Sequence, residues 1–224
     1  MIRSAPDHHL KAILFDLDGV LVDAADWHKD AFNKAMWRLD AKPLTDKEHN
    51  EIYNGLSTRK KLEMLTADGR FDQGWIVQPD FIDLFYKEKQ KFTIETIKEK
   101  CVPNQRVINT LQYAHIKGYD LAVVTNCSRH TCELMLNLSG LDGFFEFIIS
   151  NEDVDGQIKP SPRPYLEATW RLGLKQKEAL AVDDTWKGIN SALGAFCRTW
   201  HLKKFEELTV SNLKKRLDAC RYPI

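Results

Sequence analysis

The sequence has 224 residues, of which 43% are hydrophobic and 29% charged, and its 32 Lys and Arg balance 32 Asp and Glu. This balance excludes the basic field of a nucleic-acid-binding protein and the polybasic anchor of a membrane-surface protein. No apolar run approaches the roughly 20 residues of a membrane span, and the first ten residues lack a secretory hydrophobic stretch.

The five cysteines are odd in number, and no two of them are spaced as C-x-x-C. This usage indicates free thiols in a reducing compartment, so we expect a cytoplasmic protein. We also expect a monomer or weak dimer that binds a small molecule and has neither nucleic acid nor membrane as partner. The length suits one large domain, or one domain that carries a smaller insertion.

The first predicted element is a buried strand over residues 11–15, an apolar run that stops abruptly at acidic residues and Gly19. The stretch that follows has no convincing strand and predicts a helical insertion, punctuated by Gly and Pro. We therefore divide the chain into a core of residues 1–21 and 101–224 and a helical insertion of residues 22–100. The helices expected in the insertion are Trp27–Leu39, Lys47–Tyr53, Thr58–Ala67 and Phe81–Glu99.

From residue 101 onward, apolar runs alternate with segments of helical periodicity. This alternation predicts an α/β fold in which helices cover both faces of a parallel sheet. The expected helices are Asn104–Lys117, Arg129–Leu138 and Pro164–Leu172. The expected strands are Asp120–Val124, Phe144–Ile149, Ala179–Val182 and Ala195–Trp200.

Polar residues follow the predicted strands at their carboxyl ends, where ligands bind in such sheets. Asp16 and Asp18 follow the first strand, and a spacing of two lets both side chains point into the same crevice. One carboxylate can attack phosphorus as a nucleophile, while the second protonates the leaving oxygen and then activates water. Because an anionic nucleophile must approach an anionic substrate, a hard divalent cation with oxygen ligands is expected.

The other strand ends supply the remaining groups of this predicted site. Thr125 and Asn126 offer a hydroxyl and an amide for phosphate oxygens. Lys159, which precedes a proline, can pair with the nucleophile and with the charge that develops on the transferring group. Asp183 and Asp184 stand where further metal ligands are expected.

These residues lie in four ordered motifs that resemble those of the haloacid dehalogenase-like superfamily, over residues 11–200. The motifs read Asp16-Leu17-Asp18-Gly19-Val20-Leu21-Val22-Asp23, Val124-Thr125-Asn126, Lys159-Pro160-Ser161-Pro162 and Val182-Asp183-Asp184-Thr185-Trp186-Lys187-Gly188.

The resemblance implies a Rossmann-like core and an aspartyl phosphate on Asp16. It also implies Mg²⁺ held by Asp16, the backbone carbonyl of Asp18, and either Asp184 or Asp183. The insertion is similar to the helical cap of the subgroup that contains β-phosphoglucomutase and phosphoglycolate phosphatase. Asp18 disfavours dehalogenation and phosphonate cleavage, because the dehalogenases lack this second aspartate and the phosphonate-cleaving relatives replace it.

Each motif also has a structural interpretation that needs no chemistry. Asp16 and Asp18 could form a capped turn, Lys159 could be a surface lysine, and Asp183 and Asp184 could cap a helix. Thr125 and Asn126 could cap the helix at Arg129. The four motifs together favour the catalytic interpretation.

In the insertion, Thr58 and Arg59 follow a Gly-containing loop that resembles the loop such caps lower over the substrate. His28 occupies a place similar to a cap-hinge histidine of β-phosphoglucomutases. The alternatives are a turn at Asn54-Gly55 with Ser57 as an N-cap, a solvated Arg59, and an ordinary polar residue at His28. Cys127 is either redox-sensitive or, as we favour, an inert small side chain.

The leading hypothesis is a Mg²⁺-dependent phosphatase that hydrolyses a small soluble phosphate monoester, such as a sugar phosphate. The runner-up is a phosphomutase of the β-phosphoglucomutase type, which reuses the same aspartyl phosphate. His28 favours the mutase, whereas Ala24 stands where its hinge threonine is expected. A non-catalytic binding protein on this fold is the third hypothesis, disfavoured by the complete set of acidic residues together with Lys159.

Overall fold

The computed structural model describes residues 9–24, 26–53, 56, 58–71 and 80–220 of the chain. It divides into two compact units: the chain up to Asp23 together with the chain from Cys101 onward, and residues 24–100. Among the described residues, no helix combines the length and the apolar character needed to cross a membrane.

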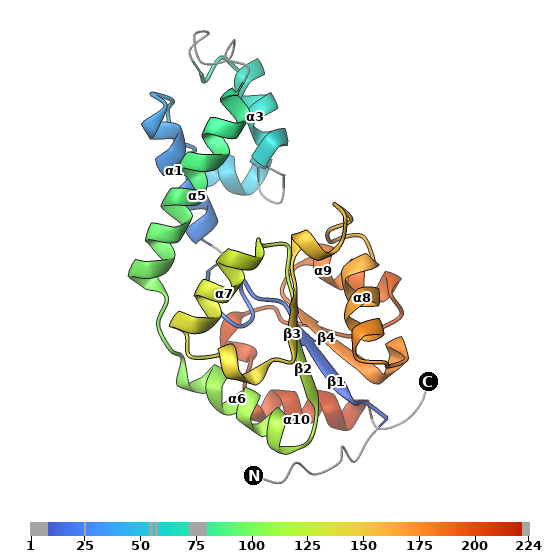
Figure 1. The fold of residues 1–224 in the computed structure, drawn as a ribbon. Coiled ribbons are helices and arrows are strands. Elements are labelled where there is room, and N and C mark those ends of the chain that lie inside the picture. The colour runs from blue at the N-terminus through green and yellow to red at the C-terminus, as the bar shows by residue number, and fades with distance from the viewer. Residues whose placement is uncertain (1–8, 25, 54–55, 57, 72–79, 221–224) are drawn as a thin grey trace. The chain divides into compact units, whose positions relative to one another are not determined.

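The first unit, the core, is built on a parallel sheet of five strands in the order β3-β2-β1-β4-β5 (Figure 1). The three central strands are buried over nearly their whole length, as expected for strands covered on both faces. The strands are β1 (Ala12–Phe15), β2 (Asp120–Val124), β3 (Phe147–Ile149), β4 (Ala179–Asp183) and β5 (Arg198–His201).

Helices cover both faces of this sheet, with α8 and α9 on one face and α6, α7 and α10 on the other (Figure 1). On the α8 and α9 side the strands present mostly alanines, such as Ala122 and Ala181, which allow the helices to pack closely. The fold class is therefore the predicted one. The helices of this unit are α6 (Gln105–Ile116), α7 (Arg129–Leu138), α8 (Arg163–Arg171), α9 (Trp186–Gly194) and α10 (Val210–Ala219).

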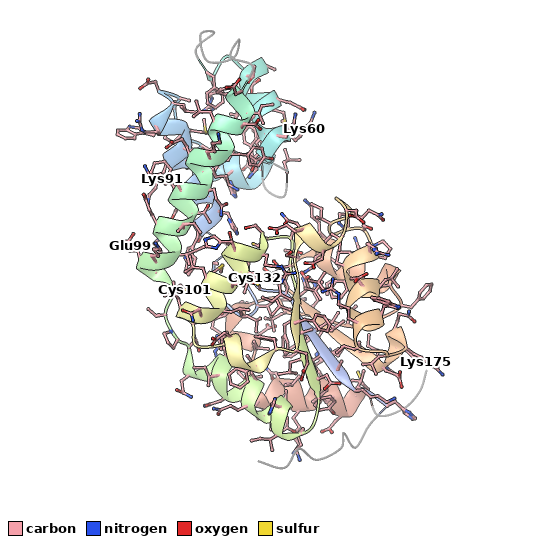
Figure 2. The ribbon with its side chains drawn as sticks, viewed as in Figure 1. Lys60, Lys91, Glu99, Cys101, Cys132 and Lys175 are labelled. Carbon is pink, nitrogen blue, oxygen red and sulfur yellow. The ribbon has the colours of Figure 1, made fainter. Side chains whose placement is uncertain are left out.

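All the regular secondary structure described in the second unit is helical, as the sequence predicts. Phe85, fully buried, is the centre of its hydrophobic core, with the rings of Phe32 and Phe71 at 4.9 and 6.1 Å. Lys60, Lys91 and Glu99 are exposed on its helices (Figure 2). The elements are α1 (Trp27–Arg38), α2 (Asp46–Glu48), a π-helical turn (His49–Tyr53), α3 (Thr58–Ala67) and α5 (Phe81–Lys100).

Two strands differ from their predicted bounds. The run 144–149 is a strand only from Phe147, because Asp142–Phe144 form a 3₁₀ turn. The run 195–200 becomes a strand only at Arg198, because α9 extends to Gly194 and its C-terminal turn takes up the next three residues. Both are edge strands, where burial leaves a weaker pattern in the sequence.

Candidate active site

The strand register brings the polar residues at three strand ends to one edge of the sheet. Phe15 pairs with Val123 on one side and with Val182 on the other. The residues one or two positions beyond these partners therefore lie at the same carboxyl edge. They are Asp16 after β1, Thr125 after β2 and Asp183 at the end of β4.

Lys159 links two of these strand ends with a single buried ammonium. Its Nζ donates to Asp16 Oδ1 at 2.6 Å and to Asp183 Oδ2 at 2.7 Å, and its side chain is only 4% exposed. Lys159 is thus not a surface lysine. A buried cation between two carboxylates leaves little freedom to either partner, so the three groups form one rigid unit.

The carboxylate of Asp183 is engaged on both oxygens. Oδ2 accepts from Lys159 Nζ and, at 3.0 Å, from the hydroxyl of Tyr165. Oδ1 accepts from the amide and the hydroxyl of Thr185 at 2.9 and 2.8 Å. Four donors fill the lone pairs that a metal ion would need.

The neighbouring Asp184 has a different environment. Its Oδ1 is buried and has no hydrogen-bond partner among the described residues. Its carboxylate lies directly over Gly19, where a Cβ would stand 2.2 Å from Oδ2. Gly188 has the same relation to Asp183, since a Cβ there would stand 1.7 Å from Oδ2. Both glycines are therefore required by the close approach of these carboxylates.

The pKa values show that the acidic groups are crowded. Burial, with the charges of Asp183 and Asp18, raises the pKa of Asp16 well above its usual range despite Lys159. Burial and then the charge of Asp183 raise the pKa of Asp184 to about 6. At Lys159 burial opposes the charged form, yet the charge of Asp16 and other neighbours raise the ammonium pKa well above normal. At Asp183 burial is likewise outweighed by Lys159, and its pKa is lowered.

This cluster fits a hard divalent cation. Asp16, Asp183 and Asp184 each present a carboxylate oxygen, all within 4.8 Å of one another. Only Lys159 offsets their charge by a direct contact among the described residues. The orphaned oxygen of Asp184 and the raised pKa of two carboxyl groups are both features that a bound cation would relieve.

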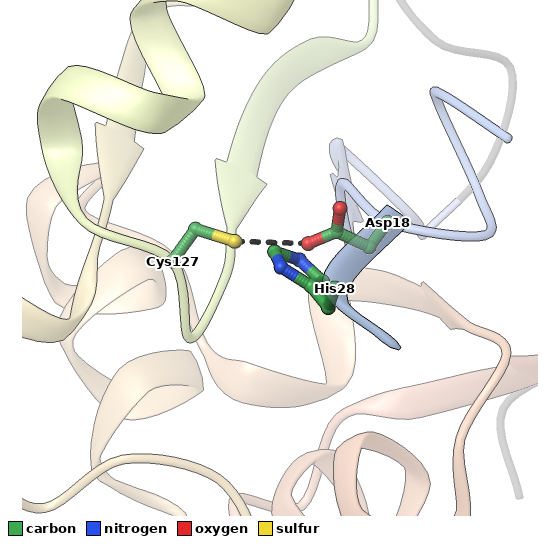
Figure 3. Close-up of side chains that lie close together, drawn as sticks. All are labelled: Asp18, His28 and Cys127. Atoms are coloured by element: carbon green, nitrogen blue, oxygen red, sulfur yellow. Dashed lines mark hydrogen bonds between the residues drawn. The ribbon is translucent and has the colours of Figure 1, made fainter. Parts of the chain in front are cut away.

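Asp18 sits in the turn that follows β1. Gly19 N donates to Val22 O at 2.8 Å and closes this turn. The Cys127 thiol donates to Asp18 Oδ2 at 2.9 Å (Figure 3). Burial, then the charge of Asp18, raises the pKa of Cys127 well above normal, so the thiol keeps its proton and is no reactive thiolate.

Thr125 and Asn126 have separate roles, and neither is the cap of α7, because Ser128 holds that position. Thr125 is buried, and its hydroxyl oxygen accepts from the Cys127 amide at 3.1 Å, which leaves the hydroxyl proton to donate. The Asn126 carboxamide instead holds the backbone of Lys159: Oδ1 accepts from Lys159 N at 2.9 Å and Nδ2 donates to Lys159 O at 3.2 Å.

The predicted substrate contacts of the insertion belong to the helical unit. Thr58 begins α3, where Arg59 is exposed, and His28 lies in the first turn of α1. Their contact with substrate stays a prediction. The alternative turn at Asn54-Gly55 and the alternative cap Ser57 lie outside the described residues.

Sequence reasoning gave no role in the site to Tyr165 or Gly188, although Gly188 is the last residue of the fourth motif. Tyr165 has the pattern of an ordinary core residue on α8, and only the fold reveals that its hydroxyl reaches Asp183. Gly188 stands three residues after the N-cap Thr185, and it is the small residue that a buried carboxylate requires in the first turn of α9.

At its carboxyl edge the sheet gathers a buried Asp–Lys–Asp unit and a carboxylate with one buried, unpartnered oxygen among the described residues. This combination is typical of an enzyme of group transfer or hydrolysis. The family model described as haloacid dehalogenase-like hydrolase matches residues 13–201. The chain therefore belongs to the haloacid dehalogenase-like hydrolases.

Two curated relatives cover most of the chain. A protein named pyrophosphatase PpaX from Bacillus pumilus is 28% identical over 89% of this chain and 88% of its own length. A phosphoglycolate phosphatase from Aquifex aeolicus is 30% identical over 85% of this chain and 83% of its own length. The crystal structure of CbbY from Rhodobacter sphaeroides in complex with phosphate shares the fold, with a TM-score of 0.73. It is 24% identical and covers 85% of this chain and 84% of that one.

Proposed function

We propose that this hydrolase is a Mg²⁺-dependent phosphatase that acts on a small soluble phosphate monoester, such as a sugar phosphate, through an aspartyl phosphate on Asp16. The observation that carries the proposal is the buried Lys159 ammonium shared by Asp16 and Asp183, beside the unpartnered oxygen of Asp184. This arrangement provides a nucleophile, a fixed positive charge and a place for a cation within one small site.

In the first step an oxygen of Asp16 attacks phosphorus, and the bond to the leaving oxygen breaks with its electron pair. Asp18 donates its proton to that oxygen, so the alcohol departs and the phosphoryl group remains on Asp16. In the second step Asp18, now a carboxylate, takes a proton from water, which attacks phosphorus. Inorganic phosphate leaves, and both carboxyl groups return to their starting states.

The remaining residues bind and orient the substrate in this proposal. The hydroxyl of Thr125 donates to a phosphate oxygen, and Lys159 offsets the charge that develops on the transferring group. Asn126 keeps Lys159 in place through the two hydrogen bonds to its backbone. Asp16, the backbone carbonyl of Asp18, and Asp184 would hold Mg²⁺, which when bound neutralises the charge between carboxylate and phosphate.

The test is Mg²⁺-dependent release of phosphate from an aryl phosphate by the wild type and by Asp16→Asn. We expect the wild type to be active and Asp16→Asn to lose at least about a thousandfold in kcat, because the amide is no nucleophile. Asp142→Asn makes the same change at an exposed aspartate and should leave kcat unaltered. An inactive wild type, or an Asp16→Asn variant as active as the wild type, contradicts the proposal.

A panel of small phosphates then addresses the substrate. It contains sugar monophosphates together with phosphoglycolate and pyrophosphate, which the names of the two curated relatives suggest. We expect the highest kcat/KM for a monoester. A need for catalytic amounts of a sugar bisphosphate, with isomerised sugar phosphate as product, would instead indicate the mutase.

A further inference from the structure

Tyr165 contacts both charged groups that stand behind the predicted nucleophile. It is the third residue of α8, its side chain is fully buried, and its hydroxyl donates to Asp183 Oδ2 at 3.0 Å. Lys159 Nζ lies over its ring, 5.3 Å from the ring centroid and within the range of a cation–π contact. One aromatic side chain thus touches the anion and the cation of the same ion pair.

The local chain explains how this side chain reaches the site. Lys159 and Tyr165 are six residues apart, and the intervening segment turns directly into α8, whose N-cap is Pro162. The Ser191 hydroxyl on α9 donates to Ser161 O and ties this segment to the next helix. Tyr165 therefore approaches Lys159 from the helix side, while Asp16 approaches it from the sheet.

Three side chains contact the Lys159 ammonium from different sides. Two hydrogen bonds lead to Asp16 and Asp183, and the Tyr165 ring covers a third side. The Tyr165 hydroxyl also shares Oδ2 of Asp183 with Lys159, so that oxygen divides its charge between two donors. This sharing weakens the hold of Asp183 on Lys159 and leaves more of the positive charge for Asp16.

We propose that Tyr165 is a positioning residue that fixes the Lys159 ammonium between Asp16 and Asp183. This inference rests on the proposed function in one respect: the position of Lys159 matters for rate because Asp16 is the nucleophile. Without the hydroxyl, Asp183 Oδ2 binds Lys159 alone and draws the ammonium away from Asp16. The expected effect is on the chemical step, and hence on kcat, rather than on substrate binding.

The kinetic test compares Tyr165→Phe with Tyr113→Phe under saturating Mg²⁺. Tyr113 is a matched control, because its ring also lies near a lysine, with Lys117 Nζ at 6.0 Å, on the surface helix α6. We expect Tyr165→Phe to lose about tenfold in kcat with KM within about twofold of the wild type. Tyr113→Phe should be unchanged. A Tyr165→Phe variant with wild-type kcat, or with its whole loss in KM, overturns the proposal.

A second pair of variants keeps an aromatic ring with a substituent in place of the hydroxyl. The pair separates a positioning role of Tyr165 from a packing role. Tyr165→4-aminophenylalanine retains a donor at the same place, whereas Tyr165→4-fluorophenylalanine has similar bulk and no donor. Positioning predicts that the amino variant recovers at least about half of the wild-type kcat and the fluoro variant does not. Equal kcat in the two variants overturns the proposal, even if Tyr165→Phe does not fold.

An activity-independent measurement distinguishes a failure of this inference from a failure of the proposed function. The Lys159 ammonium protons are followed by ¹⁵N–¹H NMR and assigned by their loss in Lys159→Arg. We expect slow exchange with water in the wild type and at least about fivefold faster exchange in Tyr165→Phe. Unchanged exchange overturns the positioning role whatever the activity, whereas an inactive wild type with this exchange difference overturns only the proposed function.

Discussion

Asp183 and Asp184 are adjacent in the chain, yet their carboxylates have opposite surroundings. Asp183 receives four hydrogen bonds, from Lys159, Tyr165 and Thr185. Asp184 Oδ1 is buried and receives none from the described residues. A carboxylate whose lone pairs are filled by donors holds its neighbours in place, while one with an open oxygen can bind a cation. The contacts thus favour Asp184 as the direct ligand of Mg²⁺, a choice that the two adjacent aspartates leave open in the sequence.

This division gives a prediction at the residue scale. Asp184→Asn should raise the Mg²⁺ concentration for half-maximal activity by about a hundredfold, because a charged ligand is lost. Asp183→Asn should lower kcat through Lys159 but change that Mg²⁺ concentration by less than about threefold. Magnesium titrations of activity, with Mn²⁺ binding followed by electron paramagnetic resonance, measure both effects. A larger change in Asp183→Asn than in Asp184→Asn would assign the ligand to Asp183 instead.

At the scale of elements, the C-terminal turn of α9 holds a phenylalanine in a backbone conformation that favours glycine. Phe196 has φ +59°, the left-handed conformation that favours glycine, and its side chain is 80% exposed. Its amide donates to Leu193 O, and the next amide, of Cys197, donates to Ala192 O, so the residue closes the helix as a glycine usually does. The exposed ring gains little from burial to offset the strain at its Cβ.

Phe196→Gly should therefore raise the free energy of unfolding by about 1 kcal/mol, after the larger backbone entropy of glycine in the unfolded chain is subtracted. Phe196→Ala is the matched control, because it removes the ring and keeps the Cβ. Urea denaturation of the three proteins measures the difference. A glycine variant no more stable than the alanine variant would show that this conformation carries no strain.

The sequence predicted elements best where the pattern arises within the element itself. The bounds of β2, α3 and α7 agree with those of the structure, and the helices α1 and α5 each differ from the predicted ones by one residue at the C-terminal end. The pattern was weaker at the edge strands, and α10 was not predicted, although the structure has a regular helix from Val210. The edge strands are half-exposed, so fewer of their positions require an apolar side chain and their hydrophobic pattern is weaker.

The candidate site was likewise predictable from the sequence only in part. That Asp16, Thr125 and Asp183 would meet followed from the geometry of parallel strands, which the sequence pattern already indicates. The hydrogen bond of Tyr165 to Asp183 and the hold of Asn126 on Lys159 depend on tertiary contacts between distant segments. A buried tyrosine or an asparagine after a strand has the same appearance in a sequence whether or not its polar atoms reach a charged group.

At the scale of the whole molecule, the two units have separate hydrophobic cores. The core unit packs around the sheet with α8 and α9, and the helical unit packs around Phe85. Asp16, Lys159, Asp183 and Asp184 all belong to the unit that contains the sheet. The residues predicted to hold Mg²⁺ therefore lie outside the helical unit.

Phe85→Ala should consequently destabilise the helical unit alone. Removal of a fully buried phenylalanine costs about 3–5 kcal/mol, through lost burial and the cavity left between Phe32 and Phe71. Hydrogen exchange should show lost protection in α1, α3 and α5, with β1, β2 and β4 unchanged, and calorimetric Mg²⁺ binding should persist. Tyr86→Ala, at the exposed neighbouring position of the same helix, is the control and should alter neither. If protection falls equally in the sheet, or Mg²⁺ binding is lost in Phe85→Ala, the two units fold as one cooperative body.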